Sequence, residues 1–152
     1  MITRVNHVSF TVADLQRSIG FYRDGLGLEQ KSRISRVDGF VSKVIGMPAA
    51  HLEIAHMGAG NCSIELIQYL APRGQKIDTR TCNVGSAHVC FNVDDFHGLL
   101  KRAVAAGGKL VGTPTPIPDG PNAGRLAVYL EDPDNNTIEF VSNQVLEVRQ
   151  AS

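Results

Sequence analysis

Four side chains of two chemical types recur in alternating order along this chain: His7, Glu65, His88 and Glu139. Imidazole nitrogens and carboxylate oxygens form a mixed ligand set that suits Zn, Ni, Co, Mn or Fe and leaves coordination positions open for water or substrate. Both glutamates stand in apolar runs, IELI at 64–67 and IEFV at 138–141. Since burying an unpaired carboxylate is costly, either this face of each strand is exposed to solvent or a cation neutralises the charge.

An internal repeat puts these residues at equivalent positions in two halves of the chain. HVSFTVAD at 7–14 matches HVCFNVDD at 88–95 with an offset of 81, and NCSIELI at 61–67 matches NNTIEFV at 135–141 with an offset of 74. A single His or Glu of this kind is more often a surface residue. The recurrence of both types in the same order favours a shared metal site, with one His–Glu pair from each half.

Both halves predict the same local structure. Residues 7–12 and 88–93 alternate as strands do, which puts each His on the face opposite the apolar side chains. Asp14 and Asp95 then stand where helix N-caps belong, and amphipathic stripes follow, ended by glycines at 25, 27, 107 and 108. Further strands are predicted at 52–57, 63–69, 126–130 and 137–142, and the proline-rich residues 112–124 are interpreted as a long loop able to cover a site.

The repeat therefore predicts two modules, each with a strand, a helix and two or three further strands. We place the first module at residues 1–70, a linker at 71–86, the second module at 87–143 and a tail at 144–152. Glu53, on a predicted neighbouring strand, is another possible base, although a solvated residue is the favoured interpretation. His51 and His56 beside it could support the metal ligands or lie at the surface, and the surface interpretation is favoured.

Composition excludes several classes of function. The 15 basic and 15 acidic residues give a net charge of +0. The chain therefore has no excess positive charge that would attract nucleic acid or an anionic membrane. No run approaches the roughly 20 apolar residues of a membrane span, and no signal peptide is evident. The three cysteines lack CxxC spacing, which argues against a disulfide framework or a cysteine zinc site and favours a cytoplasmic location.

The stretches HVSFTVADLQRSIGFYRDGLGLE, IELIQY, AHVCFNV and LEDPDNNTIEF resemble the vicinal oxygen chelate superfamily, which includes glyoxalase I, epimerases, extradiol dioxygenases and bleomycin-resistance proteins. The resemblance covers residues 4 to about 143, and residues 36–57 resemble an uncharacterised glyoxalase-like subgroup. It implies an α+β fold of two βαβββ modules, whose curled mixed sheets form a funnel-shaped site often completed by dimerisation. A homodimer is therefore expected, with one divalent metal per site held by His7, Glu65, His88 and Glu139.

The activity that this resemblance implies is that of a metal-dependent lyase, isomerase or epimerase, which stabilises an enediolate or enolate of a small α-oxygenated substrate. Glu139 is the favoured base and Glu65 the second choice. Candidate walls of the substrate pocket are Thr11, Tyr69, Cys90, Asn92 and Tyr129.

Two alternatives stay open, an Fe(II) extradiol-type dioxygenase and a non-catalytic protein that binds a drug or metabolite. The chain also departs from the glyoxalase I pattern. That pattern has an Arg at the position of Thr11 and an Asn near Tyr69, and both help to hold glutathione there. True glyoxalase I activity is therefore not expected.

Overall fold

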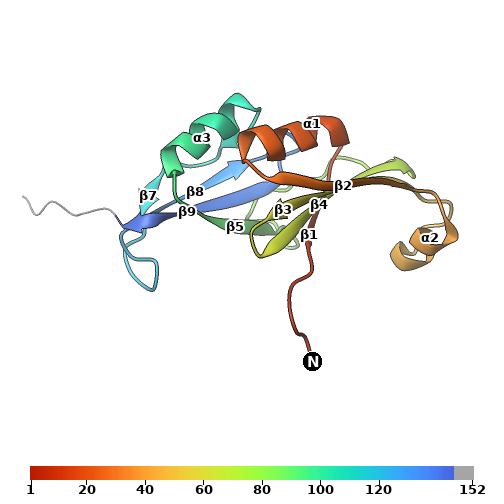
Figure 1. Cartoon of the computed structure of the whole chain (residues 1–152), viewed down its shortest axis with the longest axis horizontal. Coiled ribbons are helices and arrows are strands. Elements are labelled where there is room, and N and C mark those ends of the chain that lie inside the picture. The colour runs from red at the N-terminus through yellow and green to blue at the C-terminus, as the bar shows by residue number, and fades with distance from the viewer. Residues whose placement is uncertain (146–152) are drawn as a thin grey trace, which may run out of the picture. The chain divides into compact units, whose positions relative to one another are not determined.

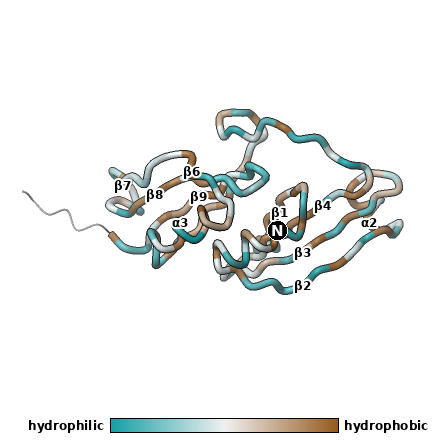
Figure 2. The backbone as a smooth tube through the Cα atoms, turned by 90° about the horizontal axis from the view of Figure 1, so that it is seen from above, coloured by the Kyte–Doolittle hydropathy of each residue, from teal (hydrophilic) through white to brown (hydrophobic). Residues whose placement is uncertain are grey.

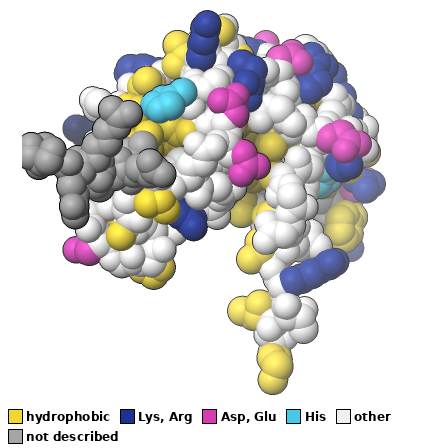
Figure 3. All heavy atoms as spheres, turned by 60° about the vertical axis from the view of Figure 1, so that its left-hand side comes forward, with side chains coloured by type: hydrophobic (Ala, Val, Ile, Leu, Met, Phe, Trp, Pro, Cys, Tyr) yellow, Lys and Arg dark blue, Asp and Glu magenta, His cyan; other side chains and the backbone are white. Residues whose placement is uncertain are grey.

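The computed structural model describes residues 1–145 of the 152-residue chain. It divides into two compact units, Met1–Asp78 and Thr79–Ser152. Within the described residues, no helix has both the length and the apolar character needed to cross a membrane. Acidic and basic side chains are interspersed on the face shown in Figure 3, with hydrophobic ones in small groups between them, in keeping with the balanced charge.

The first unit contains one mixed four-stranded sheet in the order β1-β4-β3-β2 (Figure 1). β1 and β4 are parallel, and the other neighbours are antiparallel. Its elements follow in chain order: β1 (Val8–Thr11), α1 (Leu15–Gly20), the π-helical turn η1 (Phe21–Gly25), β2 (Glu29–Arg36), α2 (Gly39–Ile45), β3 (His51–Ala59) and β4 (Cys62–Ala71).

Helix α1 covers one face of this sheet. The Asp14 carboxylate accepts a hydrogen bond of 3.0 Å from the Arg17 N–H, which confirms the predicted N-cap. The predicted stripe of Leu15, Ile19 and Tyr22 is at most 1% exposed, so these side chains form the core beneath the helix. Gln68 of β4 ties the start of α1 to the sheet, since it accepts from Leu15 N–H and donates to Ala13 C=O.

The sequence analysis did not predict β2 and α2. Helix α2 begins at the N-cap Asp38, whose side chain accepts from Val41 N–H, and ends at Gly46 with φ 68°. Asp38 and Gly46 are ordinary start and stop signals, but the intervening seven residues are too short for a clear helical period. The helix lies at one end of the sheet in Figure 1. It packs on an apolar cluster of Ile34, Val41, Ile45, Ala50, Leu52, Ile54, Ile67 and Tyr69.

The second unit contains a mixed five-stranded sheet, in the order β5-β9-β8-β6 with β7 also paired to β8. β5 and β9 are parallel, as β1 and β4 are in the first unit. Figure 2 shows hydrophobic stretches along the strands of both sheets. The elements are β5 (His88–Val93), α3 (Phe96–Ala105), β6 (Lys109–Leu110), β7 (Thr115–Pro116), β8 (Arg125–Glu131) and β9 (Thr137–Val145).

Two details of this unit differ from the expectation. The segment interpreted as a long loop contains the short strand β7, because Thr115 and Pro116 pair with Ala127 and Leu126. Strand β9 runs to Val145, so the first two residues of the predicted tail 144–152 belong to the sheet. Residues 146–152 of that tail lie outside the described residues.

Asp132 organises the turn that leads into β9. Its side chain is buried, with Oδ1 accepting from the N–H groups of Asp134 and Asn136 at 2.8 Å and Oδ2 accepting from Asn136 Nδ2 at 3.0 Å. Asn135 takes a positive φ of 68° within the same turn. The first Asp of the DPDNN sequence therefore has a structural role, since it holds the connection that brings Glu139 into the sheet.

Asp132→Ala is expected to lower the free energy of unfolding by about 2–3 kcal/mol, since two partly buried N–H groups lose a charged acceptor. Urea unfolding of the variant and the parent protein measures this loss. Asp119→Ala, at an exposed loop position, is the matched control. A loss in Asp132→Ala no larger than in this control would contradict the assigned role.

Candidate functional site

His7 and Glu65 meet on one face of the first unit's sheet. Parallel pairing sets Ser9 opposite Glu65, so His7, two residues before Ser9, shares the face of Glu65. The His7 Nε2 atom lies 3.5 Å from Glu65 Oε2, and the Glu65 side chain is only 14% exposed. The other ring nitrogen of His7, Nδ1, lies 2.9 Å from Asn6 Oδ1. Because an amide oxygen only accepts, Nδ1 donates to Asn6, which orients the ring with Nε2 toward the carboxylate.

His56 contacts the second oxygen of the Glu65 carboxylate, and the sequence analysis did not predict this contact. Antiparallel pairing sets His56 directly opposite Glu65, and its Nε2 lies 3.2 Å from Glu65 Oε1. Ser32 of β2 lies on the far side of the ring, with Oγ 2.9 Å from His56 Nδ1. The sequence analysis favoured a surface position for His56; the side chain is 30% exposed, and its ring contacts both of these partners. Only the pairing register of β3 and β4 brings His56 opposite Glu65, and no local pattern in the sequence indicates that register.

Glu53 lies on the opposite face of the sheet. The register from Glu53 to Ala59 is regular, so residues 53 and 56 point to opposite sides. Arg33 approaches Glu53 at 3.7 Å and donates to Gln16 of α1 at 2.8 Å, which puts Glu53 on the helix-covered side. This position gives Glu53 a structural role and separates it from Glu65.

His88 and Glu139 form the equivalent pair in the second unit. Parallel pairing sets Cys90 opposite Glu139, and His88 Nε2 lies 3.1 Å from Glu139 Oε2. Tyr129 stands across from Glu139 on β8, and its ring centroid lies 5.0 Å from that of His88. Within the described residues, no group of three or more His, Cys, Asp and Glu side chains is arranged so that it could hold a metal ion.

Two weak acids flank Glu139. Cys90 is exposed as a residue. Even so, partial burial of its thiol, followed by the charge of Glu139 and a hydrogen bond to it, raises the pKa of Cys90 from 9.0 to about 11. Burial, then the charges of Glu139 and Cys90, also raises the pKa of Tyr129. Both side chains therefore stay protonated near pH 7, and Cys90 is no activated nucleophile.

This environment predicts slow alkylation of Cys90 in the metal-free protein. Since the thiolate is the reactive form, the rate with iodoacetamide should rise about tenfold per pH unit between pH 7 and pH 10. Peptide mass spectrometry measures it, with the exposed Cys82 as internal reference. Glu139→Gln removes the adjacent charge and should accelerate the reaction. Equal rates in that variant and the parent protein would contradict the assigned electrostatics.

The remaining predicted pocket residues lie on the faces that carry the two pairs. In the first unit, Thr11 pairs with Ile67, two residues after Glu65, and Tyr69 follows at the next position of that face, against the apolar cluster. In the second unit, Asn92 pairs with Val141, two residues after Glu139. Their contact with a substrate stays a prediction.

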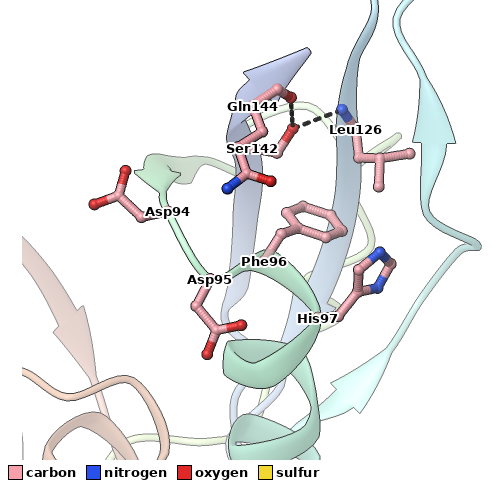
Figure 4. A pocket seen from close by; sticks show the side chains of 7 residues that line it. All are labelled: Asp94, Asp95, Phe96, His97, Leu126, Ser142 and Gln144. Carbon is pink, nitrogen blue, oxygen red and sulfur yellow. Dashed lines mark hydrogen bonds between the residues drawn. The ribbon is translucent and has the colours of Figure 1, made fainter. Parts of the chain in front are cut away.

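A separate hollow of about 490 Å³ lies at the N-terminal end of α3, lined by Asp94, Asp95, Phe96, His97, Leu126, Ser142 and Gln144 (Figure 4). Ser142 is three residues from Glu139 on the same strand, so it points to the opposite face. Its hydroxyl accepts from Leu126 N–H and donates to Gln144 C=O, as the dashed lines in Figure 4 show. The hollow contains neither His88 nor Glu139.

The chain matches the family model described as Glyoxalase/Bleomycin resistance protein/Dioxygenase superfamily over residues 4–140. A 2-epi-5-epi-valiolone epimerase from an Actinomyces species is 28% identical over 143 residues, 91% of this chain and 78% of the relative. A lactoylglutathione lyase from Haemophilus influenzae is 25% identical over 146 residues, 93% of each chain.

The crystal structure of a glyoxalase family protein from Bacillus cereus is similar with a TM-score of 0.78 and 26% identity, covering 93% of this chain and 95% of that one. This likeness and the two mixed sheets confirm the predicted α+β fold class and the family resemblance.

Proposed function

The chain belongs to the Glyoxalase/Bleomycin resistance protein/Dioxygenase superfamily, and on that basis we propose that it is a metal-dependent lyase, isomerase or epimerase. Its substrate would be a small α-oxygenated molecule, such as an α-hydroxyketone, a thioester or a thiol adduct of a 2-oxoaldehyde. Relatives named as a lyase and as an epimerase support this class of chemistry.

The observation that carries the proposal is the pairing of one His with one Glu on the same sheet face in each unit. His7 Nε2 lies 3.5 Å from Glu65 Oε2, and His88 Nε2 lies 3.1 Å from Glu139 Oε2. The Glu65 side chain is only 14% exposed, and a carboxylate partly removed from water is stabilised by a nearby positive charge. A divalent metal would supply that charge, which is worth most where water is partly excluded.

The spacing of the donor atoms fits such an ion. Two ligands each about 2.1 Å from one metal, at angles between octahedral and tetrahedral, lie about 3.0–3.4 Å apart. The His88–Glu139 separation of 3.1 Å lies within this range, and the His7–Glu65 separation of 3.5 Å lies just beyond it. His7, Glu65, His88 and Glu139 would hold the ion, and it would supply Lewis-acid stabilisation of negative charge on a substrate oxygen.

Glu139 would act as the base. Its carboxylate would accept the proton from the carbon beside the substrate oxygen and return it to the product. The raised pKa values of Cys90 and Tyr129 keep both neighbours neutral near pH 7. In the first unit, the apolar cluster beside Tyr69 offers a wall for the hydrocarbon part of a substrate.

Elemental analysis of the purified protein tests the proposal, alongside His7→Ala and Glu139→Gln. We expect a divalent metal in the parent protein and less metal in both variants. Full metal content in both would contradict the site. Iron with oxygen uptake on adding a catechol would replace the lyase, isomerase or epimerase assignment by a dioxygenase, and a metal-free protein that binds a small molecule unchanged would replace it by a binding protein.

The expected partners follow from the same assignment. A small-molecule substrate and a homodimer are proposed, and analytical ultracentrifugation of the purified chain tests the dimer. A monomer at micromolar concentration would contradict it.

A further inference from the structure

The two glutamates of the proposed site differ in how their second oxygen is held. In the first unit, Glu65 Oε1 lies 3.2 Å from His56 Nε2, while Oε2 faces His7 at 3.5 Å. The imidazoles of His7 and His56 therefore contact different oxygens of the Glu65 carboxylate. The Glu65 side chain, 14% exposed, has little room to move between them.

His56 lies between Ser32 and Glu65. A carboxylate oxygen only accepts, so His56 Nε2 carries a hydrogen and donates it to Glu65 Oε1. The Ser32 hydroxyl, 2.9 Å from His56 Nδ1, can then donate to that nitrogen. Ser32 thus orients the ring, and the ring orients the carboxylate. His7 contacts the other oxygen of Glu65, and its Nδ1 lies 2.9 Å from Asn6 Oδ1.

The second unit replaces this arrangement with weaker partners. The position of His56, directly opposite the glutamate on the neighbouring strand, is taken there by Tyr129. Besides His88 Nε2 at 3.1 Å, the neighbour that hydrogen-bonds Glu139 is the Cys90 thiol, and thiols are weak donors. Glu139 therefore has one imidazole contact and a weak thiol donor, whereas Glu65 has an imidazole on each of its two oxygens.

We propose that His56, oriented by Ser32, is a positioning residue that fixes Glu65 as a permanent one-oxygen ligand and leaves Glu139 as the carboxylate free to move a proton. This inference rests on the proposed function, since it assigns different duties to the two glutamates of that site. The hydrogen bond from His56 holds one oxygen of Glu65 and leaves the other for the metal. Partners of this kind are typically worth 10- to 100-fold in metal affinity.

Binding of Co²⁺ and Zn²⁺, measured by competition with a chromophoric chelator, tests this role without a substrate. His56→Leu should weaken binding 10- to 100-fold. His56→Gln keeps an N–H donor within reach of Glu65 and should recover most of the affinity. Ser32→Ala, a small change on a neighbouring strand, should weaken binding in the same direction by a smaller factor. The d–d spectrum of bound Co²⁺ should change in His56→Leu and return toward the parent spectrum in His56→Gln.

The chain offers a matched control. His51 stands near the start of the same strand, and its Nε2 lies 3.2 Å from the hydroxyl of Ser35, so it repeats the His–Ser pairing away from Glu65. His51→Gln should leave the Co²⁺ and Zn²⁺ affinities unchanged. Circular dichroism and urea unfolding of every variant separate a loss of affinity from a loss of fold.

The outcomes separate the two proposals. Metal binding that is lost in Glu65→Ala but unchanged in His56→Leu and Ser32→Ala would overturn the role of His56 and leave the proposed metal site standing. A parent protein that binds neither Co²⁺ nor Zn²⁺ more tightly than Glu65→Ala would overturn both. Equal weakening in His56→Leu and His56→Gln would show that the ring contributes only packing, and would also overturn the positioning role.

Discussion

Replacing Glu139 with glutamine is expected to slow α-proton exchange by about 10²- to 10⁴-fold, the usual contribution of a positioned general base. Glutamine keeps the shape of the side chain and an oxygen that can face a metal, but it cannot accept the proton. Proton NMR in D₂O measures the exchange for a panel of α-hydroxyketones, thioesters and thiol adducts of 2-oxoaldehydes. Because exchange reports proton removal itself, the result does not depend on knowing which product forms.

Two other glutamates make this test selective. Glu53→Gln changes a carboxylate on the helix-covered face, paired with Arg33, and should leave the exchange rate unchanged. Glu65→Gln should act mainly through weaker metal binding, so that added metal restores much of the rate. If Glu65→Gln at saturating metal is slower than Glu139→Gln, the base is Glu65 and our assignment of the two glutamates is wrong.

Removing the metal is expected to lower both activity and stability. A ligand that binds only the folded state at 100 times its Kd stabilises that state by about 2.7 kcal/mol. For a chain of this size, that corresponds to a rise in Tm of roughly 5–10 °C. Calorimetry of the chelator-treated protein, before and after adding Zn²⁺ or Co²⁺, measures the rise, and the same addition should restore α-proton exchange.

Variants of single histidines show whether this stabilisation comes from the proposed pairs. His7→Ala and His88→Ala each remove a direct ligand and should abolish most of the rise in Tm. His97→Ala changes an exposed histidine on α3 and should keep the full rise. A rise that survives in His7→Ala and His88→Ala but disappears in His97→Ala would indicate binding to surface histidines.

Much of the site could be predicted from local sequence patterns. The repeat identified the two His–Glu pairs, and strand alternation put each His on the face opposite Val8, Phe10 and their counterparts. The structure has the same arrangement, with His7 beside Glu65 and His88 beside Glu139. The helix caps at Asp14 and Asp95 also follow from the sequence, since each carboxylate bonds an N–H only three residues away.

Other features depended on pairing between strands. His56 reaches Glu65 only because β3 and β4 pair in one particular register, and a shift of one residue would turn it to the other face. Ser32 belongs to β2, a strand that the sequence analysis did not identify, and it meets His56 across 24 residues of chain. Periodicity along a segment carries no information about either contact.

The sequence by itself determined which residues could bind a metal, that they come in two equivalent pairs, and which face of its strand each one occupies. Those properties follow from residue type and from spacings of two to four residues. Only the tertiary structure decided that the pairs are chemically unequal, with an oriented imidazole on Glu65 and a protonated thiol and phenol beside Glu139. The reason is that hydrogen-bond partners and burial are set by cross-strand register, which is a property of the packed sheet.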